Sequence, residues 1–298
     1  MTIRELYRDY IQQLKQVYDA GEATEITNRV FETVAGIARF DIVKHPQQVA
    51  DASISAQLHH CLSALLQHNP VQYVLGEAWF YKMKLKVSDQ VLIPRSETEE
   101  LVQLVIDDYC PHVERKPLSK SDWQLPCQDI SMLDIGTGSG CIAIAIKKNL
   151  PAASISAIDV SEAALAVAIE NAGQQQASIH FLQLDFLNEN NWNDLSIFDV
   201  IISNPPYIPL NERSKLEKNA TAFEPPAALF VPDNAPLIFY EKIAAFGKGH
   251  LTKTGRIYVE INEDLAKETK EVFDHFYLVE IKKDIFGKER MLVITPKD

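Results

Sequence analysis

The chain has 298 residues, enough for a catalytic domain and a smaller partner domain. Its 46% hydrophobic and 23% charged residues are ordinary for a soluble globular protein. The net charge of −12 disfavours sequence-independent nucleic-acid binding, which needs Lys and Arg to meet phosphates, and is compatible with a basic protein partner.

The cysteines and histidines point away from disulfides and metals. The four cysteines lack paired spacing, which predicts reduced thiols in a cytoplasmic protein; they are Cys61, Cys110, Cys127 and Cys141. The histidines form no Cys/His cluster, so we expect no metal. The segment MTIRELYRDY has no apolar signal core, and no run approaches the roughly 18 apolar residues of a membrane span. We therefore expect neither a signal peptide nor a membrane segment.

Residues 1–75 have the periodicity of a helical bundle. Thr2 and Glu5 have the spacing of a capping box, and an apolar stripe follows them. A second helix is expected from Thr24 to about Phe40, and a later one ends before Asn69 and Pro70. No chemistry is visible in this domain, so we expect it to dock a partner or to stabilise the fold.

The linker, residues 76–95, contains an alternation of apolar and lysine residues from Ala78 to Val87 that predicts a β-hairpin. Ser96 and Glu99 have the spacing of a second capping box and open an amphipathic helix. Residues 111–129 hold three prolines and no period, so we expect a surface loop there.

Residues 96–298 are expected to form an α/β domain. Short apolar strands alternate with helices, which predicts a mostly parallel sheet with helices on both faces. The expected strands are Met132–Ile135, Ser154–Ile158, Ile179–Leu184, Phe198–Ser203 and Arg256–Ile261. The expected helices are Cys141–Asn149, Ala163–Asn171 (stopped by Gly173), Leu237–Phe246 and Glu263–Phe276. Leu278–Lys283 and Arg290–Thr295 are expected to close the sheet as an antiparallel hairpin.

A glycine-rich turn, LDIGTGSG, follows the first of these strands. Its glycines, Gly136, Gly138 and Gly140, let the backbone approach a ligand closely. The turn is not the dinucleotide fingerprint, because Cys141 stands where the third glycine belongs, and it is not a P-loop. Asp134 lies just before the turn, where it either caps the turn or contacts a ligand.

Acidic residues end the next two strands. Asp159 lies 23 residues beyond Gly136, a suitable place to accept both ribose hydroxyls of a nucleoside. Asp185 is placed to receive an adenine amino group, and Phe186 to cover the ring. Asp159 and Asp185 also have a purely structural interpretation, Asp159 as an acid at the start of a helix.

The fourth strand ends in Asn204-Pro205-Pro206-Tyr207. Prolines lack a backbone donor and have a fixed φ, so these residues are expected to form a stiff ledge rich in acceptors. A planar NH2 group lying on Tyr207 can give its hydrogens to Asn204 and to the ledge carbonyls. The alternative is an ordinary proline-rich loop. Because all four signals fall at one sheet edge, we predict a class-I S-adenosylmethionine-dependent methyltransferase.

With these residues in view, the chain resembles the release-factor glutamine methyltransferase family. The resemblance extends over nearly the whole chain, in the blocks QYVLGEAWFY, VLIPRSETEEL, LDIGTGSGCIAIAI, VIISNPPYI, FEPPAAL and LIFYEKI. It implies methylation of the glutamine in the Gly-Gly-Gln motif of class-1 peptide chain release factors, with S-adenosyl-L-homocysteine as product. If residues 1–75 dock a partner, the resemblance implies that this partner is the release factor.

The same resemblance implies roles for individual residues. The cofactor would contact Gly136, Thr137, Gly138, Ser139, Gly140, Asp159, Phe186 and Asn204. The substrate glutamine would lie on Asn204, Pro205, Pro206 and Tyr207, of which Asn204, Pro205 and Tyr207 would carry the catalysis. Three positions depart from the family pattern: Ser96 replaces a proline, the 230–236 loop lacks a glycine pair, and Asn262 replaces glycine or histidine.

Two other functions remain open at this point. Adenine-N6 and cytosine-N4 methyltransferases carry the same Asn-Pro-Pro-Tyr motif and would flip a base onto Tyr207. The acidic charge and the blocks outside the motif disfavour a nucleic-acid substrate. A non-catalytic scaffold that binds the cofactor is disfavoured by the intact ledge.

Overall fold

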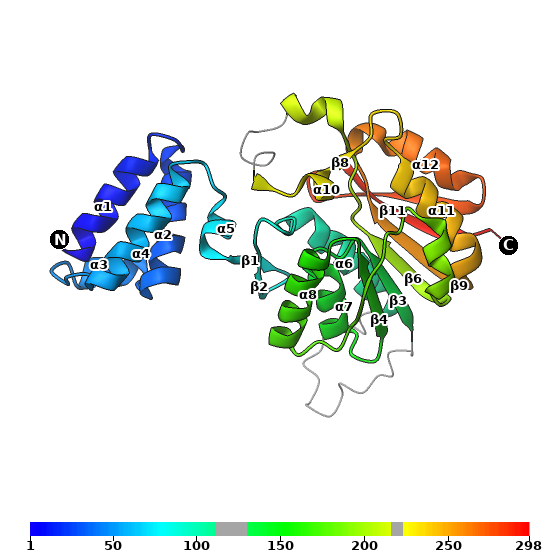
Figure 1. The fold of residues 1–298 in the computed structure, drawn as a ribbon, viewed down its shortest axis with the longest axis horizontal. Helices are drawn as coiled ribbons and strands as arrows, with labels where there is room; N and C mark the ends of the chain where they lie inside the picture. The colour runs from blue at the N-terminus through cyan, green and yellow to red at the C-terminus, as the bar shows by residue number, and fades with distance from the viewer. Residues whose placement is uncertain (111–129, 216–222, 298) are drawn as a thin grey trace. The chain divides into compact units, whose positions relative to one another are not determined.

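The computed structural model describes residues 1–110, 130–215 and 223–297 (Figure 1). The surface loop expected at 111–129 lies outside the described residues. The chain divides into two compact units, one essentially Met1–Glu77 and the other beginning at Ala78. No helix in the described ranges is long and apolar enough to cross a membrane.

The first unit is helical, as expected. Its helices are α1 (Ile3–Leu14), α2 (Ala20–Ala35), α3 (Arg39–Lys44), α4 (Ala52–Leu65) and α5 (Val71–Leu75). The capping box at α1 is confirmed: Glu5 N donates to Thr2 Oγ1 at 3.2 Å, and Thr2 N donates to Glu5 Oε2 at 2.8 Å. Phe31 is fully buried at the centre of this unit, with the rings of Tyr7 and Tyr10 in edge contact.

The helix expected from Thr24 to Phe40 has different ends in the structure. It begins at Ala20, because the Asp19 carboxylate accepts from the backbone N–H groups of Gly21 and Glu22. It ends at Ala35, because Gly36 takes the left-handed conformation with φ of 65°. The expected boundaries were therefore wrong, because Asp19 and Gly36 set the two ends of the helix.

The hairpin is confirmed as β1 (Glu77–Phe80) and β2 (Met83–Lys86). The helix after it, α6 (Ser96–Tyr109), lacks the expected capping box: Arg95 is its N-cap residue and makes no side-chain cap bond. Glu99 instead accepts from the backbone N–H of Tyr81 in the hairpin turn at 2.8 Å. The Glu99 side chain therefore links α6 to the hairpin instead of capping the helix.

The second unit contains the predicted seven-stranded sheet. Its strands are β3 (Ser131–Ile135), β4 (Ser154–Asp159), β5 (His180–Gln183), β6 (Phe198–Ser203), β9 (Leu251–Glu260), β10 (Tyr277–Lys283) and β11 (Glu289–Pro296). Their order is β10-β11-β9-β6-β3-β4-β5. β11 is antiparallel to both neighbours, and the pairings from β9 to β5 are parallel. The mostly parallel sheet with a terminal antiparallel hairpin is thus confirmed.

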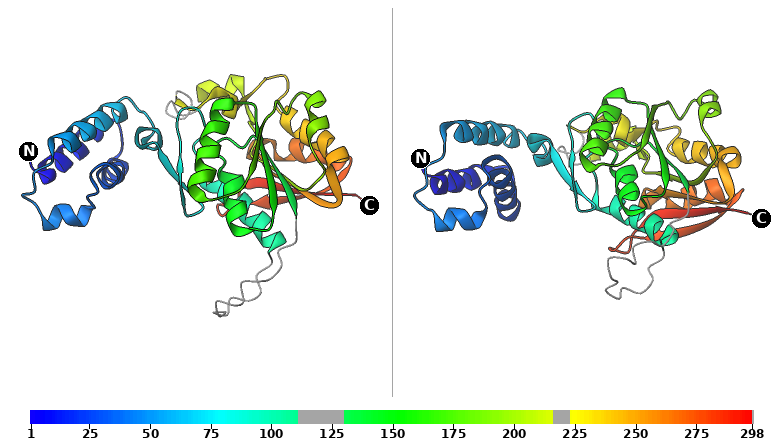
Figure 2. Two further views of the ribbon diagram at one scale, coloured as in Figure 1. Left: turned by 60° about the horizontal axis from the view of Figure 1, so that its bottom comes forward. Right: turned by 90° about the horizontal axis from the view of Figure 1, so that it is seen from below.

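Helices cover both faces of this sheet. α6, α7 (Cys141–Asn149) and α8 (Glu162–Gln175) lie on one face, and α11 (Ile238–His250) and α12 (Ala266–Asp274) on the other (Figures 1 and 2). Neighbouring strand residues alternate between the two cores, Met132 facing the first and Leu133 the second. Gly173 does not stop α8 as expected, since the helix continues until Gln176 takes a φ of 55°.

The segment after β6 contains further short elements. They are β7 (Ile208–Pro209), η2 (Leu210–Lys215), α10 (Pro226–Leu229) and β8 (Phe230–Val231), with η1 (Glu189–Asp194) and η3 (Glu263–Leu265) elsewhere. β7 pairs in parallel with β8, and the Glu224 carboxylate accepts from Ile93 N at 3.1 Å and Arg95 Nη2 at 2.5 Å. These bonds anchor the segment that follows the ledge.

Chain order reverses at β3, which lies between β4 and β6. In an open parallel sheet such a reversal leaves a crevice beyond the carboxyl ends of the strands, where ligands bind. Asp159 is the last residue of a strand that ends at this edge, and the glycine turn and Asn204 directly follow two others.

Candidate active site

The glycine turn joins β3 to α7 with three residues at positive φ: Gly136 (72°), Gly138 (54°) and Gly140 (80°). A Cβ atom at Gly136 or Gly138 would meet no described atom within 4 Å, so the backbone there is open to a ligand. A Cβ at Gly140 would lie 3.1 Å from both Ala168 Cβ and Ile144 Cδ1. Gly140 therefore allows α7 to pack against α8, whereas the other two glycines leave a binding surface.

The two hydroxyl residues of the turn point inward. Thr137 is 3% exposed and its Oγ1 donates to Asp134 Oδ2 at 2.7 Å, and Ser139 is 2% exposed. Their side chains are therefore buried, and contact with a cofactor would come from their backbone. Asp134 lies beneath the turn, and its burial raises the pKa of its carboxyl to about 7.

Asp159 is the last residue of β4 and supports the same turn. Its Oδ2 accepts from Gly138 N at 2.9 Å, and its Oδ1 accepts from Ser161 N at 3.0 Å. A carboxylate oxygen can accept more than one hydrogen bond, so Asp159 retains acceptor capacity for a diol. The structure thus brings Asp159 to the glycine turn.

Asp185 and Phe186 differ in their surroundings. Asp185 is exposed, and its Oδ1 accepts from Leu187 N at 3.0 Å. Phe186 is 5% exposed, with ring centroids 5.5 Å from Trp192 and 5.4 Å from Phe246. Its ring belongs to the core between the sheet and α11, so covering an adenine ring stays a prediction for Phe186.

The ledge begins where β6 ends. Ser203 Oγ donates to Ile135 O at 2.7 Å and ties β6 to the residue before the glycine turn. Pro205 is buried, while Asn204, Pro206 and Tyr207 are partly exposed. Burial and the nearby Glu260 carboxylate raise the pKa of Tyr207, so its phenol stays protonated near neutral pH.

Two residues that the sequence analysis did not assign complete this part of the site. Asn204 Nδ2 donates to Thr98 Oγ1 at 3.0 Å, and Thr98 Oγ1 donates to Glu260 Oε2 at 2.7 Å. Thr98 and Glu260 are each 2% exposed. A signal for Glu260 was present in the sequence, because an acid ending an apolar strand is unusual in a core.

Relatives of this chain share its full length. The release factor glutamine methyltransferase of Flavobacterium psychrophilum is 38% identical over 99% of this chain and 99% of its own. The protein of the same name from Bacteroides thetaiotaomicron is 36% identical over 95% of this chain and 96% of its own. The chain belongs to the release factor glutamine methyltransferase family. Two family descriptions also match, the PrmC N-terminal domain at residues 5–76 and the methyltransferase small domain at residues 123–222.

Within this family member, Asn171 on α8 connects the hairpin to the glycine turn. Asn171 is fully buried; its Nδ2 donates to Lys86 O and to Ser139 O, each at 2.9 Å. Its Oδ1 accepts from Lys86 N at 2.6 Å. One amide therefore satisfies backbone groups of β2 and of the turn at once.

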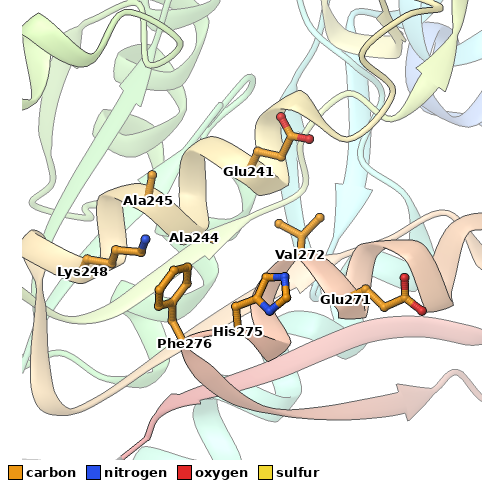
Figure 3. A pocket seen from close by; sticks show the side chains of 8 residues that line it. All are labelled: Glu241, Ala244, Ala245, Lys248, Glu271, Val272, His275 and Phe276. Carbon is orange, nitrogen blue, oxygen red and sulfur yellow. The ribbon is translucent and has the colours of Figure 1, made fainter.

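A pocket of about 260 Å³ lies between α11 and α12, away from the glycine turn and the ledge (Figure 3). Lys248 Nζ lies 3.2 Å from the centroid of the Phe276 ring there. None of the predicted site residues of this methyltransferase lines the pocket. In the described part of the chain, no group of three His, Cys, Asp or Glu side chains is arranged to hold a metal ion.

The pKa of Asp134 predicts a pH-dependent stability. Burial raises this pKa from 3.8 to about 7. The stability that the neutral carboxyl contributes to the folded protein is therefore fully present below pH 3.8 and is lost as the pH rises to about 7. Asp134→Asn cannot ionise. Its Tm relative to wild type should therefore increase between about pH 5 and pH 8 in calorimetric scans. Asp89→Asn, at an exposed position, is the control, and a Tm difference for Asp134→Asn that stays constant with pH would contradict the prediction.

Proposed function

We propose that this protein transfers a methyl group from S-adenosylmethionine to the side-chain amide nitrogen of a glutamine in class-1 peptide chain release factors. The glutamine is that of the Gly-Gly-Gln motif. The observation that carries the proposal is the position of the ledge, Asn204–Tyr207, at the sheet edge next to the open glycine turn. Relatives that match this chain over their full length are named release factor glutamine methyltransferase.

The residues at the glycine turn fit the proposed cofactor. Gly136 and Gly138 leave room for its amino-acid part, and Asp159 offers acceptors for its ribose. Asp185 is the proposed partner of the adenine amino group, because its carboxylate is exposed at the end of the neighbouring strand. When bound, S-adenosylmethionine supplies an electrophilic methyl group.

The chain's own task is to make a poor nucleophile reactive. The lone pair of a glutamine amide is delocalised into its carbonyl, so the nitrogen must be aimed and its positive charge stabilised as it develops. We assign Asn204 Oδ1 and the carbonyl of Pro205 as acceptors of the two amide hydrogens, and the Tyr207 ring as the surface below the NH2 group. Fixed acceptors of this kind stabilise developing charge without reorganisation. Correct positioning can supply roughly 7–11 kcal/mol of the barrier reduction.

The helical unit has a proposed role in docking. We propose that residues 1–75 contact the release factor, because they carry none of the groups that the reaction needs and match the description of a separate domain, the PrmC N-terminal domain. Since release factors act in translation, we propose that the reaction takes place in the cytoplasm. Nucleic acid is not a proposed substrate.

The first test is the identity of the substrate. Labelled S-adenosylmethionine and a purified release factor should yield label on the glutamine of the Gly-Gly-Gln tripeptide, located by peptide mapping. A release factor with that glutamine replaced is the matched control and should remain unlabelled. Label on duplex DNA with none on the release factor would favour the adenine or cytosine alternative.

The second test concerns the cofactor. Asp159→Ala should weaken S-adenosylmethionine binding by about 1.5–3 kcal/mol in calorimetry, the range for hydrogen bonds to a charged group. Asp89→Ala, in the exposed turn after the hairpin, is the control and should bind like wild type. Unchanged affinity in Asp159→Ala would remove Asp159 from the site.

The third test concerns the ledge. Asn204→Ala leaves one substrate N–H without its acceptor, so kcat should fall by about 10²–10³-fold, as for loss of one oxyanion-hole donor. The loss should fall mainly on kcat, because the contact strengthens as charge develops on nitrogen. Single-turnover methyl transfer at saturating cofactor measures it. A rate near that of wild type would disprove the amide-polarising role of Asn204.

A further inference from the structure

Three side chains from separate elements form a chain of hydrogen bonds behind the ledge. Asn204 follows β6, Thr98 lies in the first turn of α6, and Glu260 ends β9. The donor–acceptor distances are 3.0 Å from Asn204 to Thr98 and 2.7 Å from Thr98 to Glu260. Thr98 and Glu260 are almost completely buried, so water is largely excluded as an alternative hydrogen-bond partner for their side chains.

The chemistry of these groups fixes the direction of the chain. A threonine hydroxyl has one hydrogen to donate, and a carboxylate can only accept. Thr98 therefore donates to Glu260 and is left as an acceptor toward Asn204. The end of the Asn204 amide that faces Thr98 must then be its NH2 group, and Oδ1 lies on the opposite branch.

Burial raises the pKa of Glu260 to about 7, and the negative charge of Glu97 acts in the same direction. The hydrogen bond from Thr98 and the positive charges of Arg290 and Arg95 favour the ionised form. Arg290 lies on β11 and Arg95 just before α6. Above this pKa the carboxylate accepts only, and the direction of the chain is fixed.

This direction matters for the proposed reaction. The substrate NH2 group needs an acceptor, and an Asn204 amide turned by 180° would present it with a second NH2 group instead. An asparagine without a directing partner can take both orientations, which differ little in shape. Loss of one hydrogen bond of ordinary strength changes the ratio of the two orientations by about 2- to 10-fold, and it also frees the amide to tilt away from the substrate nitrogen.

We propose that Thr98 and Glu260 are positioning residues, which hold the Asn204 amide with Oδ1 toward the substrate nitrogen. This inference rests on the proposed function. A purely structural alternative is that the Thr98–Glu260 bond only fastens α6 to β9. The two differ in one respect: a positioning role acts through Asn204 and disappears without it.

The kinetic test compares Thr98→Val with Thr98→Ser at about pH 8.5, where Glu260 is ionised. Valine keeps the shape but removes the hydroxyl, and kcat for methyl transfer should fall about 10-fold, the lower end of what orienting partners cost. KM for the release factor should change less than about 2-fold. Serine restores the hydroxyl and should keep kcat within about 2-fold of wild type.

A double-mutant cycle with Asn204→Ala separates positioning from fastening. In that background, Thr98→Val should lower kcat by less than about 2-fold, because there is no amide left to orient. An equal 10-fold loss in both backgrounds would overturn the proposal, as would wild-type kcat in Thr98→Val alone. If Thr98→Val does not fold, as judged by its Tm, Thr98→Ala takes its place in the cycle.

A spectroscopic measurement tests the orientation of the Asn204 amide without any turnover. It therefore remains decisive even if the proposed substrate is wrong. In protein labelled with ¹⁵N at asparagine, the Asn204 side-chain NH2 signals are identified by their loss in Asn204→Ala. They should shift and exchange faster with water in Thr98→Val, and should stay near their wild-type positions in Thr98→Ser. Unchanged signals in Thr98→Val would overturn the proposal.

Discussion

Strand β6 pairs in parallel with β3 on one side and with β9 on the other, so the three strands leave the sheet at one edge. Ser203 is aligned with Ile135 and with Val259. The glycine turn, the ledge and Glu260 therefore follow neighbouring strand ends. Parallel strands need long crossover connections, and these connections supply the helices that bury both faces of the sheet.

Much of this arrangement was predictable from the sequence, because its signals are local. The apolar runs gave the strand order along the chain, and the helix Cys141–Asn149 and the strand Phe198–Ser203 have the predicted ends. The glycine turn was recognisable for the same reason, since glycine at positive φ is a property of single residues. The family's blocks then implied the roles proposed for the ledge residues.

What was missed depends on contacts between distant residues. Glu99 has the spacing of a capping residue, yet its carboxylate accepts from Tyr81 in the hairpin. Thr98 and Glu260 are 162 residues apart, and only the sheet order brings them together behind Asn204. Likewise, no local rule shows that Phe186 packs against Trp192 and Phe246 in the core. Local patterns fix the strands, whereas the partners of their polar ends come from the tertiary structure.

Asn171 has a consequence for the dynamics of the protein. Its amide holds Lys86 in the hairpin and Ser139 in the glycine turn, and it is fully buried. Opening the hairpin at β2 therefore releases two of the three hydrogen bonds that fix this amide, and it loosens the side chain that also holds Ser139. A ligand that binds only the closed turn lowers the population of the open state. Hydrogen exchange at the Lys86 amide is therefore expected to slow when a ligand occupies the glycine turn, although Lys86 itself lies outside the site.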